Sequence, residues 1–471
     1  LAVGTPRDFG ALPFQPDFAP DDPSRREEYL LRSHAAGVWL LGATEEAVAH
    51  AVWDFLHRLG YRHFFPGDIW EIILSSSRIE AALDTFQRPD YVSRNLRSRF
   101  IGEHDAQAYE LWQRRNRLAE GQAMAGGHIY GAILRARKAE FDRHPEYLGL
   151  IEGERKSSKF CIANPGLRRL VVDYALDYFT ENPDANSISM EPSDGGDWCE
   201  CADCAAIGGI SDRAVTLANT VAATLAERHP GKHVGMLAYN LHSEPPSITP
   251  HPLLRISVAA GYLRGGYRPE EMFAAWRARG VQGDFGVFEY YCNTTSRFTP
   301  RGQRISDLVY LQHTIPLFHA QGARRMVAGT AVANGPVGLG AYMAARMLWD
   351  VGEAARMPEI YSDFLERAFG AAREPMDAFY RLVYRVDDFD LNLPVTDDTI
   401  GRMYRHLDEA LKRTKDRDTV RRIEALLLYT RFVDLCSVYE RLDDDEARLA
   451  ADTDILRHVW RMRTATMVNT Y

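Results

Sequence analysis

The chain has 471 residues, 46% of them hydrophobic and 26% charged, with a formal net charge of -9 at pH 7. Such a composition excludes a disordered chain, and the length predicts more than one domain around a large apolar core. The negative charge argues against nucleic acid as a partner, because binding a phosphate backbone requires a basic surface. The sequence contains no run of about 18 apolar residues, so we expect no membrane-spanning segment.

The chain begins at Leu1, without Met and without an apolar signal segment. A start of this kind is consistent with a trimmed N-terminus, so two compartments stay open: the cytoplasm, or export after removal of a signal. Neither the composition nor any motif indicates an oligomeric state.

Residues 1–88 are predicted to form a small α/β domain. Gly37–Gly42 is an apolar strand candidate, and Thr44 can cap a helix that ends at Leu59, before Gly60. Two short strands are expected to follow, at residues 61–65 and 71–74.

Residues 89–350 alternate short β-like runs with helical patterns, which is typical of an α/β fold. Eight runs fit the strands of a (β/α)8 barrel, whose parallel strands need helical crossovers. The predicted strands are 94–100, 126–130, 160–163, 186–190, 233–239, 254–260, 285–291 and 325–329. The clearest predicted helices are 166–179, 212–228, 269–279, 306–321 and 336–350.

Residues 351–471 are predicted to form a C-terminal α-helical domain, because strand signals stop and apolar residues recur at spacings of three and four. Ile423, Leu426 and Phe432 lie on such a face. We expect this domain to pack on the flank of the barrel.

Three of the six cysteines form the run Cys199, Cys201 and Cys204. These thiols are close enough to share one Zn²⁺, but a structural zinc site normally takes four ligands, and no fourth Cys or His lies nearby in the sequence. A metal tie, a disulfide and plain reduced thiols therefore all stay open. A tie would brace the loop that carries Asp194 rather than react, and no other cofactor is indicated.

Carboxyl groups follow two of the predicted strands. Glu191 and Asp194 come directly after the fourth strand, and Glu289 lies at the end of the seventh, between aromatic residues. Active sites of α/β barrels lie at the C-terminal ends of the strands, and burial there would raise the pKa of Glu289. The alternatives are an Asp194 that only makes a turn with the next glycine, and a buried Glu289 bonded to an Arg or Tyr.

Further polar and aromatic residues lie at the ends of the predicted strands, where a sugar site would need hydroxyl partners and stacking faces. Arg97 would suit a uronate carboxylate through a bidentate contact, and Gly126-Gly127 could bring His128 onto a substrate. The candidate substrate-binding residues are Asn95, Arg97, His128, Tyr239, Asn240, His242, Tyr262, Tyr290, Tyr291, Asn293 and Asn334.

Several segments carry a family resemblance. Residues 51–56 and 60–67 resemble the domain that precedes the barrel in α-glucuronidases and β-hexosaminidases. Together with residues 144–147, 161–165, 192–195 and the cysteine run, they resemble a large bacterial family of uncharacterised proteins that share the α-glucuronidase layout. The likeness covers roughly residues 37–350 and implies a barrel and a carbohydrate substrate.

The resemblance also implies roles for the carboxyl groups. Asp194 lies in the loop where α-glucuronidases place their acid Glu, so it is the first candidate for the general acid, with the longer Glu191 as the alternative. Glu289 and Tyr290 match a Glu-Tyr pair on the seventh strand of that family. The Asp and Glu pair that activates water there has no clear counterpart in this sequence.

The sequence therefore predicts a carbohydrate-active enzyme, an exo-acting glycoside hydrolase whose substrate is an oligosaccharide or polysaccharide containing uronic acid or a related sugar. Such hydrolysis needs two carboxyl groups that flank the scissile bond. The alternatives are a polysaccharide lyase, in which a Tyr or His abstracts a proton beside a uronate, and a non-catalytic sugar-binding protein on a barrel scaffold. No G-x-S-x-G, P-loop or H-E-x-x-H motif supports a serine hydrolase, a nucleotide site or a zinc protease.

Overall fold

The computed structural model describes residues 1–73, 82–98, 103–121, 123–292, 304–330, 333–386 and 395–468. The chain divides into two compact units. The first unit comprises Leu1–Glu120, Tyr290–Pro316 and Ala328–Tyr471, and the second comprises Gly121–Glu289 and Leu317–Val327. Among the described residues, no helix combines the length and the apolar character that a membrane crossing requires.

The first unit opens with a four-stranded sheet in the order β1-β3-β2-β6. Its strands are β1 (Ala2–Gly4), β2 (Tyr29–His34), β3 (Gly37–Gly42) and β6 (Asp84–Gln87). β3 pairs with β1 in parallel and with β2 in antiparallel fashion. Of these four strands the sequence predicts only β3. β2 is held in the sheet by the antiparallel hairpin that it forms with β3, a pairing that the residues of β2 alone do not indicate.

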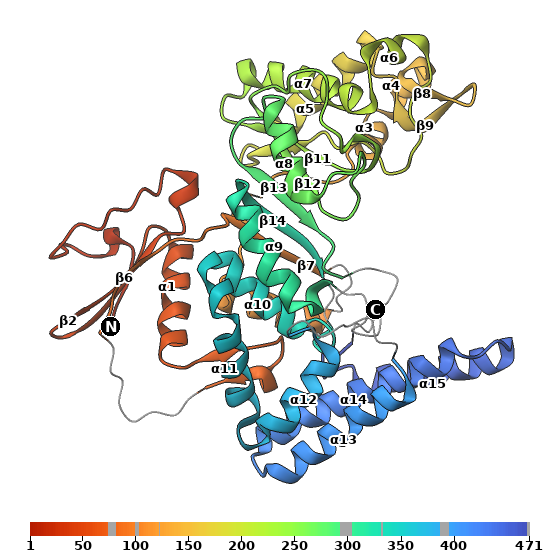
Figure 1. The fold of residues 1–471 in the computed structure, drawn as a ribbon. Coiled ribbons are helices and arrows are strands. Elements are labelled where there is room, and N and C mark those ends of the chain that lie inside the picture. Colours follow the sequence, from red (N-terminus) through yellow and green to blue (C-terminus); the bar gives the residue numbers. More distant parts are fainter. Residues whose placement is uncertain are drawn as a thin grey trace. The chain divides into compact units, whose positions relative to one another are not determined.

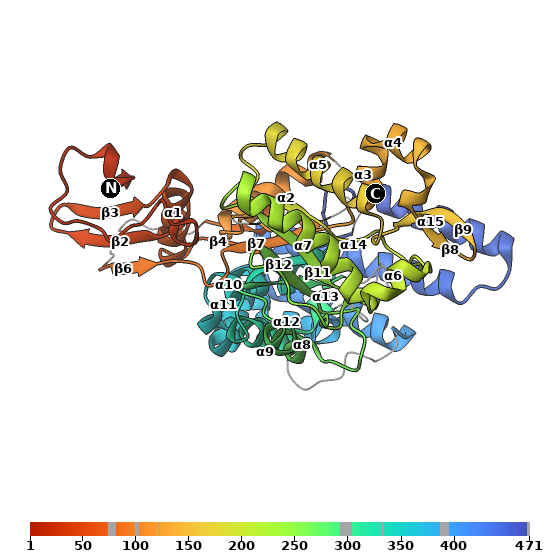
Figure 2. The same cartoon turned by 90° about the horizontal axis from the view of Figure 1, so that it is seen from above.

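Helix α1 (Glu45–Arg58) lies beside this sheet (Figure 2). The predicted cap is present, since the Thr44 side chain accepts a hydrogen bond from the Ala47 N–H. Ala51 and Phe55 of α1 pack with Tyr29, Leu31 and other buried residues of β2 and β3. The predicted strands at 61–65 and 71–74 are reduced to an antiparallel pair of two-residue strands, β4 (Arg62–His63) and β5 (Glu71–Ile72).

The rest of the first unit is mostly helical, in agreement with the predicted pattern after residue 351. Leu426, Tyr429 and Phe432 of one long helix are buried, as their spacing predicts. The helices are α2 (Glu103–Arg115), α10 (Gly338–Trp349), α11 (Met357–Phe369), α12 (Arg373–Val383), α13 (Asp397–Arg413), α14 (Arg417–Glu440) and α15 (Asp445–Met462) (Figure 1).

The second unit contains four neighbouring parallel strands, β10 (Ser187–Ser189), β11 (His233–Ala238), β12 (Leu254–Ala259) and β13 (Phe285–Glu289). Figure 1 shows β11, β12 and β13 side by side. Because the strands are parallel, the residues that follow them lie at one edge of the sheet. Two of the predicted helices form crossovers between these strands: α7 (Ile210–Arg228) leads from β10 to β11, and α8 (Pro269–Ala278) leads from β12 to β13. A third predicted helix, α5 (Pro165–Glu181), precedes β10.

The chain runs between the two units through α9 (Leu308–Ala320) and β14 (Ala323–Thr330). β14 and β7 (Ser93–Ser98) complete a six-stranded sheet, in the order β10-β11-β12-β13-β14-β7. Six of the eight predicted strands are therefore present. The described residues form a mixed α/β fold with an open sheet rather than the predicted closed (β/α)8 barrel.

The predictions of strands at 126–130 and 160–163 are wrong, for different reasons. Gly127 has a φ of 109°, which a strand does not allow, and Tyr130 already begins α3 (Tyr130–Ala136). Phe160 ends β9 (Glu154–Phe160), which forms an antiparallel hairpin with β8 (Leu148–Ile151). The short helices α4 (Lys138–Arg143) and α6 (Ala202–Ile207) complete the second unit.

The segment before α3 is bound to β10 by serine side chains and not by backbone hydrogen bonds of a β-ladder. The Ser187 hydroxyl accepts a hydrogen bond of 2.8 Å from the Ala125 N–H, and the Ser189 hydroxyl donates one of 2.7 Å to the Gly127 carbonyl. The segment 123–128 therefore lies against the sheet without being a strand of it. Gly235 of β11 permits this approach, since a Cβ there would lie 2.1 Å from the Ala125 oxygen.

Candidate active site

Glu191 follows β10 and is completely buried. Its Oε2 accepts a hydrogen bond of 2.8 Å from the Leu237 N–H, and its Oε1 lies 2.8 Å from Nε2 of His242. The Glu191 carbonyl accepts a third bond, of 2.9 Å, from the Ile129 N–H. Both carboxylate oxygens are thus in hydrogen-bonding contact with neighbouring segments of the second unit.

Tyr239 and His242 follow β11, and their rings connect the buried carboxylate to the surface. The centroids of these two rings lie 6.0 Å apart. His242 is buried beside Glu191, whereas Tyr239 is half-buried. Tyr239 also meets His128 at 6.2 Å and Tyr262 at 5.7 Å, measured between ring centroids. Four of the predicted substrate-binding residues therefore form one aromatic cluster.

Asp194 is exposed, and the Tyr239 hydroxyl donates a hydrogen bond of 3.1 Å to its Oδ1. The same oxygen accepts the Gly195 N–H at 2.8 Å. The bond from Gly195 is the largest cause that lowers the pKa of Asp194, followed by Tyr239 and the charges of His128 and Lys159. Desolvation and the bond to Asp194 raise the pKa of Tyr239 to about 12. Asp194 is therefore a carboxylate at neutral pH, and Tyr239 stays protonated.

Lys159 and Trp198 shape the loop that carries Asp194, and the sequence analysis singled out neither. The Lys159 ammonium donates hydrogen bonds to the carbonyls of Asp194 at 3.0 Å and Gly195 at 3.3 Å. It also lies 5.7 Å from the centre of the Trp198 ring. Lys159 is the penultimate residue of the hairpin strand β9, and no local signal in the sequence pointed to it.

The loop after β12 contributes the exposed face of the cluster. Tyr262 is 49% exposed, and its carbonyl accepts a hydrogen bond of 2.8 Å from the Asn240 N–H. Asn240 has a positive φ of 47°, a conformation that Asn tolerates better than most residues. Its Oδ1 accepts a bond of 3.2 Å from Arg264, an exposed cation that the sequence analysis did not consider. Arg264 lies two residues after Tyr262, in a loop that follows a strand, and this position was the signal in the sequence that could have identified it as a candidate.

His128 is exposed beside Tyr239, and its Nδ1 is in hydrogen-bonding contact with the Pro192 carbonyl. It reaches this place from the segment 123–128. Gly127, directly before it, has a positive φ of 109°. Glu289 is the last residue of β13 and completely buried.

The other described candidates, Asn95, Arg97, Tyr290, Tyr291 and Asn334, belong to the first unit. Asn334 is buried, and its amide donates hydrogen bonds to the Pro66 carbonyl at 3.0 Å and to the Thr466 hydroxyl at 2.8 Å, so it links chain segments there. Asn95 is buried too and donates to Glu120. Arg97 is exposed at β7, Tyr290 is half-buried, Tyr291 is buried, and Asn293 lies outside the described residues.

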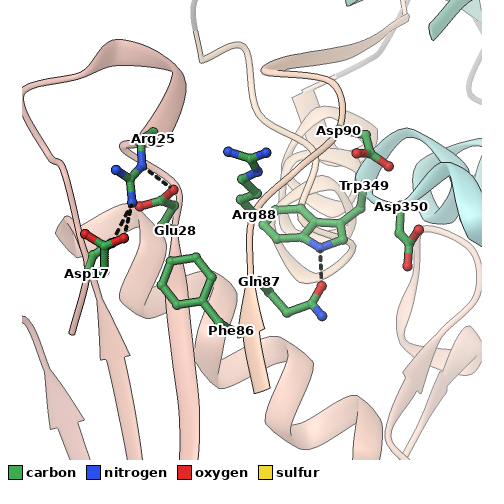
Figure 3. A pocket seen from close by; sticks show the side chains of 9 residues that line it. All are labelled: Asp17, Arg25, Glu28, Phe86, Gln87, Arg88, Asp90, Trp349 and Asp350. Atoms are coloured by element: carbon green, nitrogen blue, oxygen red, sulfur yellow. Dashed lines mark hydrogen bonds and ion pairs between the residues drawn. The ribbon is translucent and has the colours of Figure 1, made fainter. Parts of the chain in front are cut away.

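The first unit also contains a cavity of about 610 Å³ (Figure 3). Several of its charged side chains form ion pairs with one another or hydrogen bonds with the backbone. Arg25 pairs with Glu28 at 2.6 Å and with Asp17 at 3.5 Å, while Asp90 accepts the Val351 N–H. None of the predicted site residues lines this cavity. We therefore regard it as a structural feature of the first unit.

The cysteine run gains a fourth thiol in the folded chain, that of Cys161. Residue 161 follows the hairpin β8–β9 and is 38 residues before Cys199 in the sequence. The four sulfur atoms lie within 4.8 Å of one another. No fourth Cys or His lies near the run in the sequence, but the fold brings Cys161 beside it.

A sequence model of a family described as a domain of unknown function, DUF4838, matches residues 73–380. No curated protein matches the chain. The structure of a family 89 glycoside hydrolase from Clostridium perfringens in complex with PUGNAc is similar at a TM-score of 0.55 and 10% identity, covering 92% of this chain and 61% of that one.

A second similar structure is CpGH89 from Clostridium perfringens, in complex with its substrate GlcNAc-alpha-1,4-galactose. The TM-score is 0.57 at 10% identity, with 92% of this chain and 61% of that one covered. The chain thus spans about three fifths of the length of both structures. At this identity the likeness concerns the fold alone.

Proposed function

The chain belongs to the DUF4838 family, and on this premise we propose that it is an exo-acting glycoside hydrolase of glycans that contain uronic acid or a related sugar. One observation carries the proposal. The exposed carboxylate of Asp194 is held by Tyr239 at the edge of the sheet where the parallel strands end. Fold likeness to glycoside hydrolases supports the same class of reaction.

The ionisation of Asp194 changes the role that the sequence analysis assigned to it. A general acid must be protonated before the reaction, but hydrogen bonds from Gly195 and Tyr239 keep the pKa of Asp194 low. Asp194 is therefore the carboxylate of the pair, which attacks the sugar or activates water. Proton donation then falls to Glu289, which also lies at the end of a parallel strand of the second unit.

The neighbours of Asp194 suit a sugar. Tyr262 offers an exposed aromatic face, and Tyr239 and His128 offer polar atoms beside it. Arg264 is exposed next to Asn240, where its guanidinium can bind the carboxylate of a uronate. Within the second unit, Arg264 takes over the role that the sequence analysis gave to Arg97.

The lyase alternative has less support, because it needs a deprotonated Tyr or a neutral His as base. The Tyr239 hydroxyl donates a hydrogen bond to Asp194, and its pKa of about 12 leaves very little of the phenolate that could act as a base at neutral pH. A non-catalytic sugar-binding protein is the third possibility, which binding without bond cleavage would distinguish.

The test is a panel of oligosaccharides incubated with the purified protein and analysed by mass spectrometry. Hydrolysis adds water to the products, whereas elimination adds none and creates an ultraviolet-absorbing double bond. We expect Asp194→Asn and Glu289→Gln to abolish turnover at unchanged circular dichroism. Asp197 is an exposed carboxylate of the same loop, and the control variant Asp197→Asn should retain turnover. Full activity of both site variants would refute the proposed roles.

A further inference from the structure

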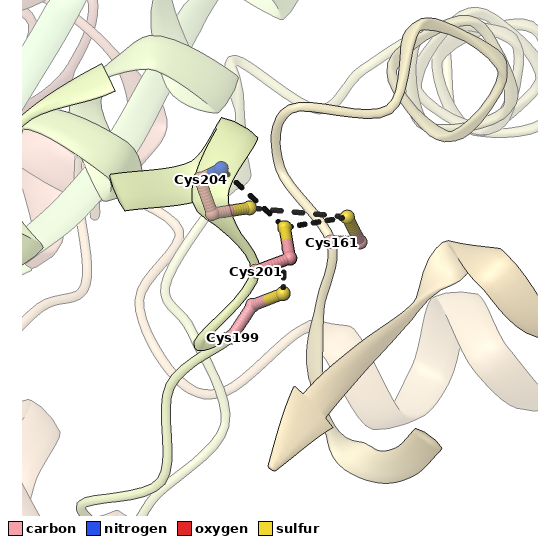
Figure 4. A group of neighbouring side chains, drawn as sticks. All are labelled: Cys161, Cys199, Cys201 and Cys204. Atoms are coloured by element: carbon pink, nitrogen blue, oxygen red, sulfur yellow. Dashed lines mark hydrogen bonds between the residues drawn. The ribbon is translucent and has the colours of Figure 1, made fainter. Parts of the chain in front are cut away.

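Four cysteine thiols of the second unit converge on one point (Figure 4). Cys161 Sγ lies 3.7 Å from Cys201 Sγ and 3.8 Å from Cys204 Sγ, and Cys199 Sγ lies 3.4 Å from Cys201 Sγ. Cys161 comes from the end of the hairpin β8–β9, Cys199 and Cys201 from the loop after β10, and Cys204 from α6. Three separate segments therefore supply the cluster.

We infer that these four thiols bind one Zn²⁺ in a closed structural site. A zinc–sulfur bond is about 2.3 Å, so two ligands of a regular tetrahedron lie ~3.8 Å apart. The observed separations of 3.4 to 3.8 Å agree with that spacing. A disulfide requires about 2.05 Å, and all four cysteines are free. Four sulfur ligands in a tetrahedron are typical of zinc or a single iron.

Backbone N–H groups already point at the sulfur atoms. The Leu150 N–H donates to Cys199 at 3.3 Å, the Ala163 N–H to Cys204 at 3.4 Å, and the Cys204 N–H to Cys201 at 3.4 Å. Hydrogen bonds of this kind orient metal ligands and offset the negative charge of thiolates. Three of the four cysteines are also buried, which keeps water out of the coordination sphere.

The metal would tie the hairpin β8–β9 to the loop that carries Asp194. The two segments already meet through the Glu200 N–H, which donates to the Leu150 carbonyl at 2.7 Å. Lys159, two residues before Cys161, holds the carbonyl of Asp194 at 3.0 Å. A zinc ion with four protein ligands has no open position for water, so its role here is structural. The inference does not depend on the proposed hydrolase activity.

The first test measures the metal content of the purified full-length chain by elemental mass spectrometry. We expect one zinc per chain in the wild type and a loss of it in Cys161→Ser. The matched control is Cys436→Ser, which removes a buried thiol of α14 in the first unit and should keep the zinc. Iron in place of zinc, or a Cys161→Ser variant that retains its zinc, would overturn the inference.

A second test needs no variant, so it holds even where Cys161→Ser does not fold. Zinc is removed from the wild type with a chelator under reducing conditions, and Co²⁺ is added. A tetrahedral cobalt–thiolate spectrum and a thermal midpoint that falls on removal and recovers with zinc are the expected results. No uptake of either metal by the reduced protein, or disulfides among the four cysteines in peptide mass spectra, would refute the site.

Discussion

Nε2 of His242 lies 2.8 Å from Oε1 of the completely buried Glu191. The other carboxylate oxygen accepts the Leu237 N–H at 2.8 Å. The Glu191 side chain thus binds both the backbone near the end of β11, at Leu237, and the imidazole of His242, which follows that strand. This places Tyr239, between Leu237 and His242, where its hydroxyl reaches Asp194.

Removing this carboxylate should destabilise the second unit. Glu191→Ala leaves the Leu237 N–H and the His242 ring buried without their acceptor, which we expect to lower the free energy of unfolding by ~2–5 kcal/mol. Urea denaturation of the full chain measures the change. The control is Glu227→Ala, an exposed residue near the end of α7, which should stay within ~0.5 kcal/mol of the wild type. Equal losses in the two variants would contradict the assignment.

The hydroxyl of Tyr239 should lower the pH at which activity is lost on acidification, the acid limb of the pH–activity profile. Its hydrogen bond stabilises the carboxylate of Asp194, so Tyr239→Phe raises the pKa of Asp194 towards its ordinary value of 3.8. Because the carboxylate is the active form, activity should then be lost at a higher pH as the solution is acidified. The bond from Gly195 persists and keeps the pKa below that ordinary value.

The measurement is the pH dependence of kcat/KM on whichever substrate the oligosaccharide panel identifies. Tyr267→Phe removes a hydroxyl from a partly exposed ring further along the same loop as Tyr262 and should leave the acid limb in place. An acid limb that moves to lower pH in Tyr239→Phe would contradict the assignment of Asp194 as the carboxylate.

Lys159 should order the loop that carries Asp194. Lys159→Met keeps much of the side-chain volume but removes the donors to the carbonyls of Asp194 and Gly195. We expect amide hydrogens of residues 193–198 to exchange several-fold faster, since a loop with fewer hydrogen bonds opens more often. Lys156→Met, which removes an exposed ion pair with Glu152 on the same hairpin, is the control with little effect on this loop. Indistinguishable exchange in the two variants would rule out the bracing role.

Two helix glycines of the first unit should respond in opposite ways to alanine. A Cβ on Gly340 of α10 would lie 1.7 Å from the Ile305 carbonyl oxygen, so Gly340→Ala should cost ~3 kcal/mol or more. On Gly401 of α13 the nearest atom is the end of the Arg405 side chain at 3.6 Å, so Gly401→Ala should stabilise by ~0.5–1 kcal/mol through helix propensity. Chemical denaturation measures both, and changes of the same sign would contradict the packing around Gly340.

Local signals were sufficient for the helices that the sequence analysis named and for most of the central strands. The Thr44 cap and the spacing of apolar residues predicted a helix ending near residue 59, and α1 spans Glu45–Arg58. The predicted strand at 254–260 is β12, Leu254–Ala259. Caps and apolar periodicity are properties of neighbouring residues, so the sequence carries them directly.

A closed barrel is not confirmed among the described residues, and one of the two wrong strand predictions concerns a segment that depends on a distant partner. Residues 123–128 are held by the hydroxyls of Ser187 and Ser189, about sixty residues away in the sequence, and no pattern within the segment marks that arrangement. Asn334 was a candidate for binding a substrate because it follows a strand. Its amide instead holds Pro66 and Thr466 together.

By itself the sequence determined which residue types follow which strands, and therefore that Asp194, Tyr239 and Tyr262 occupy one edge of a parallel sheet. Only the tertiary structure decided that Tyr239 donates to Asp194, that Glu191 is buried against His242, and that Cys161 joins the other three thiols. The physical reason is the distance along the sequence over which each kind of interaction acts. Periodicity and capping act over a few residues, whereas a hydrogen bond or a ligand set joins atoms that the fold alone brings together.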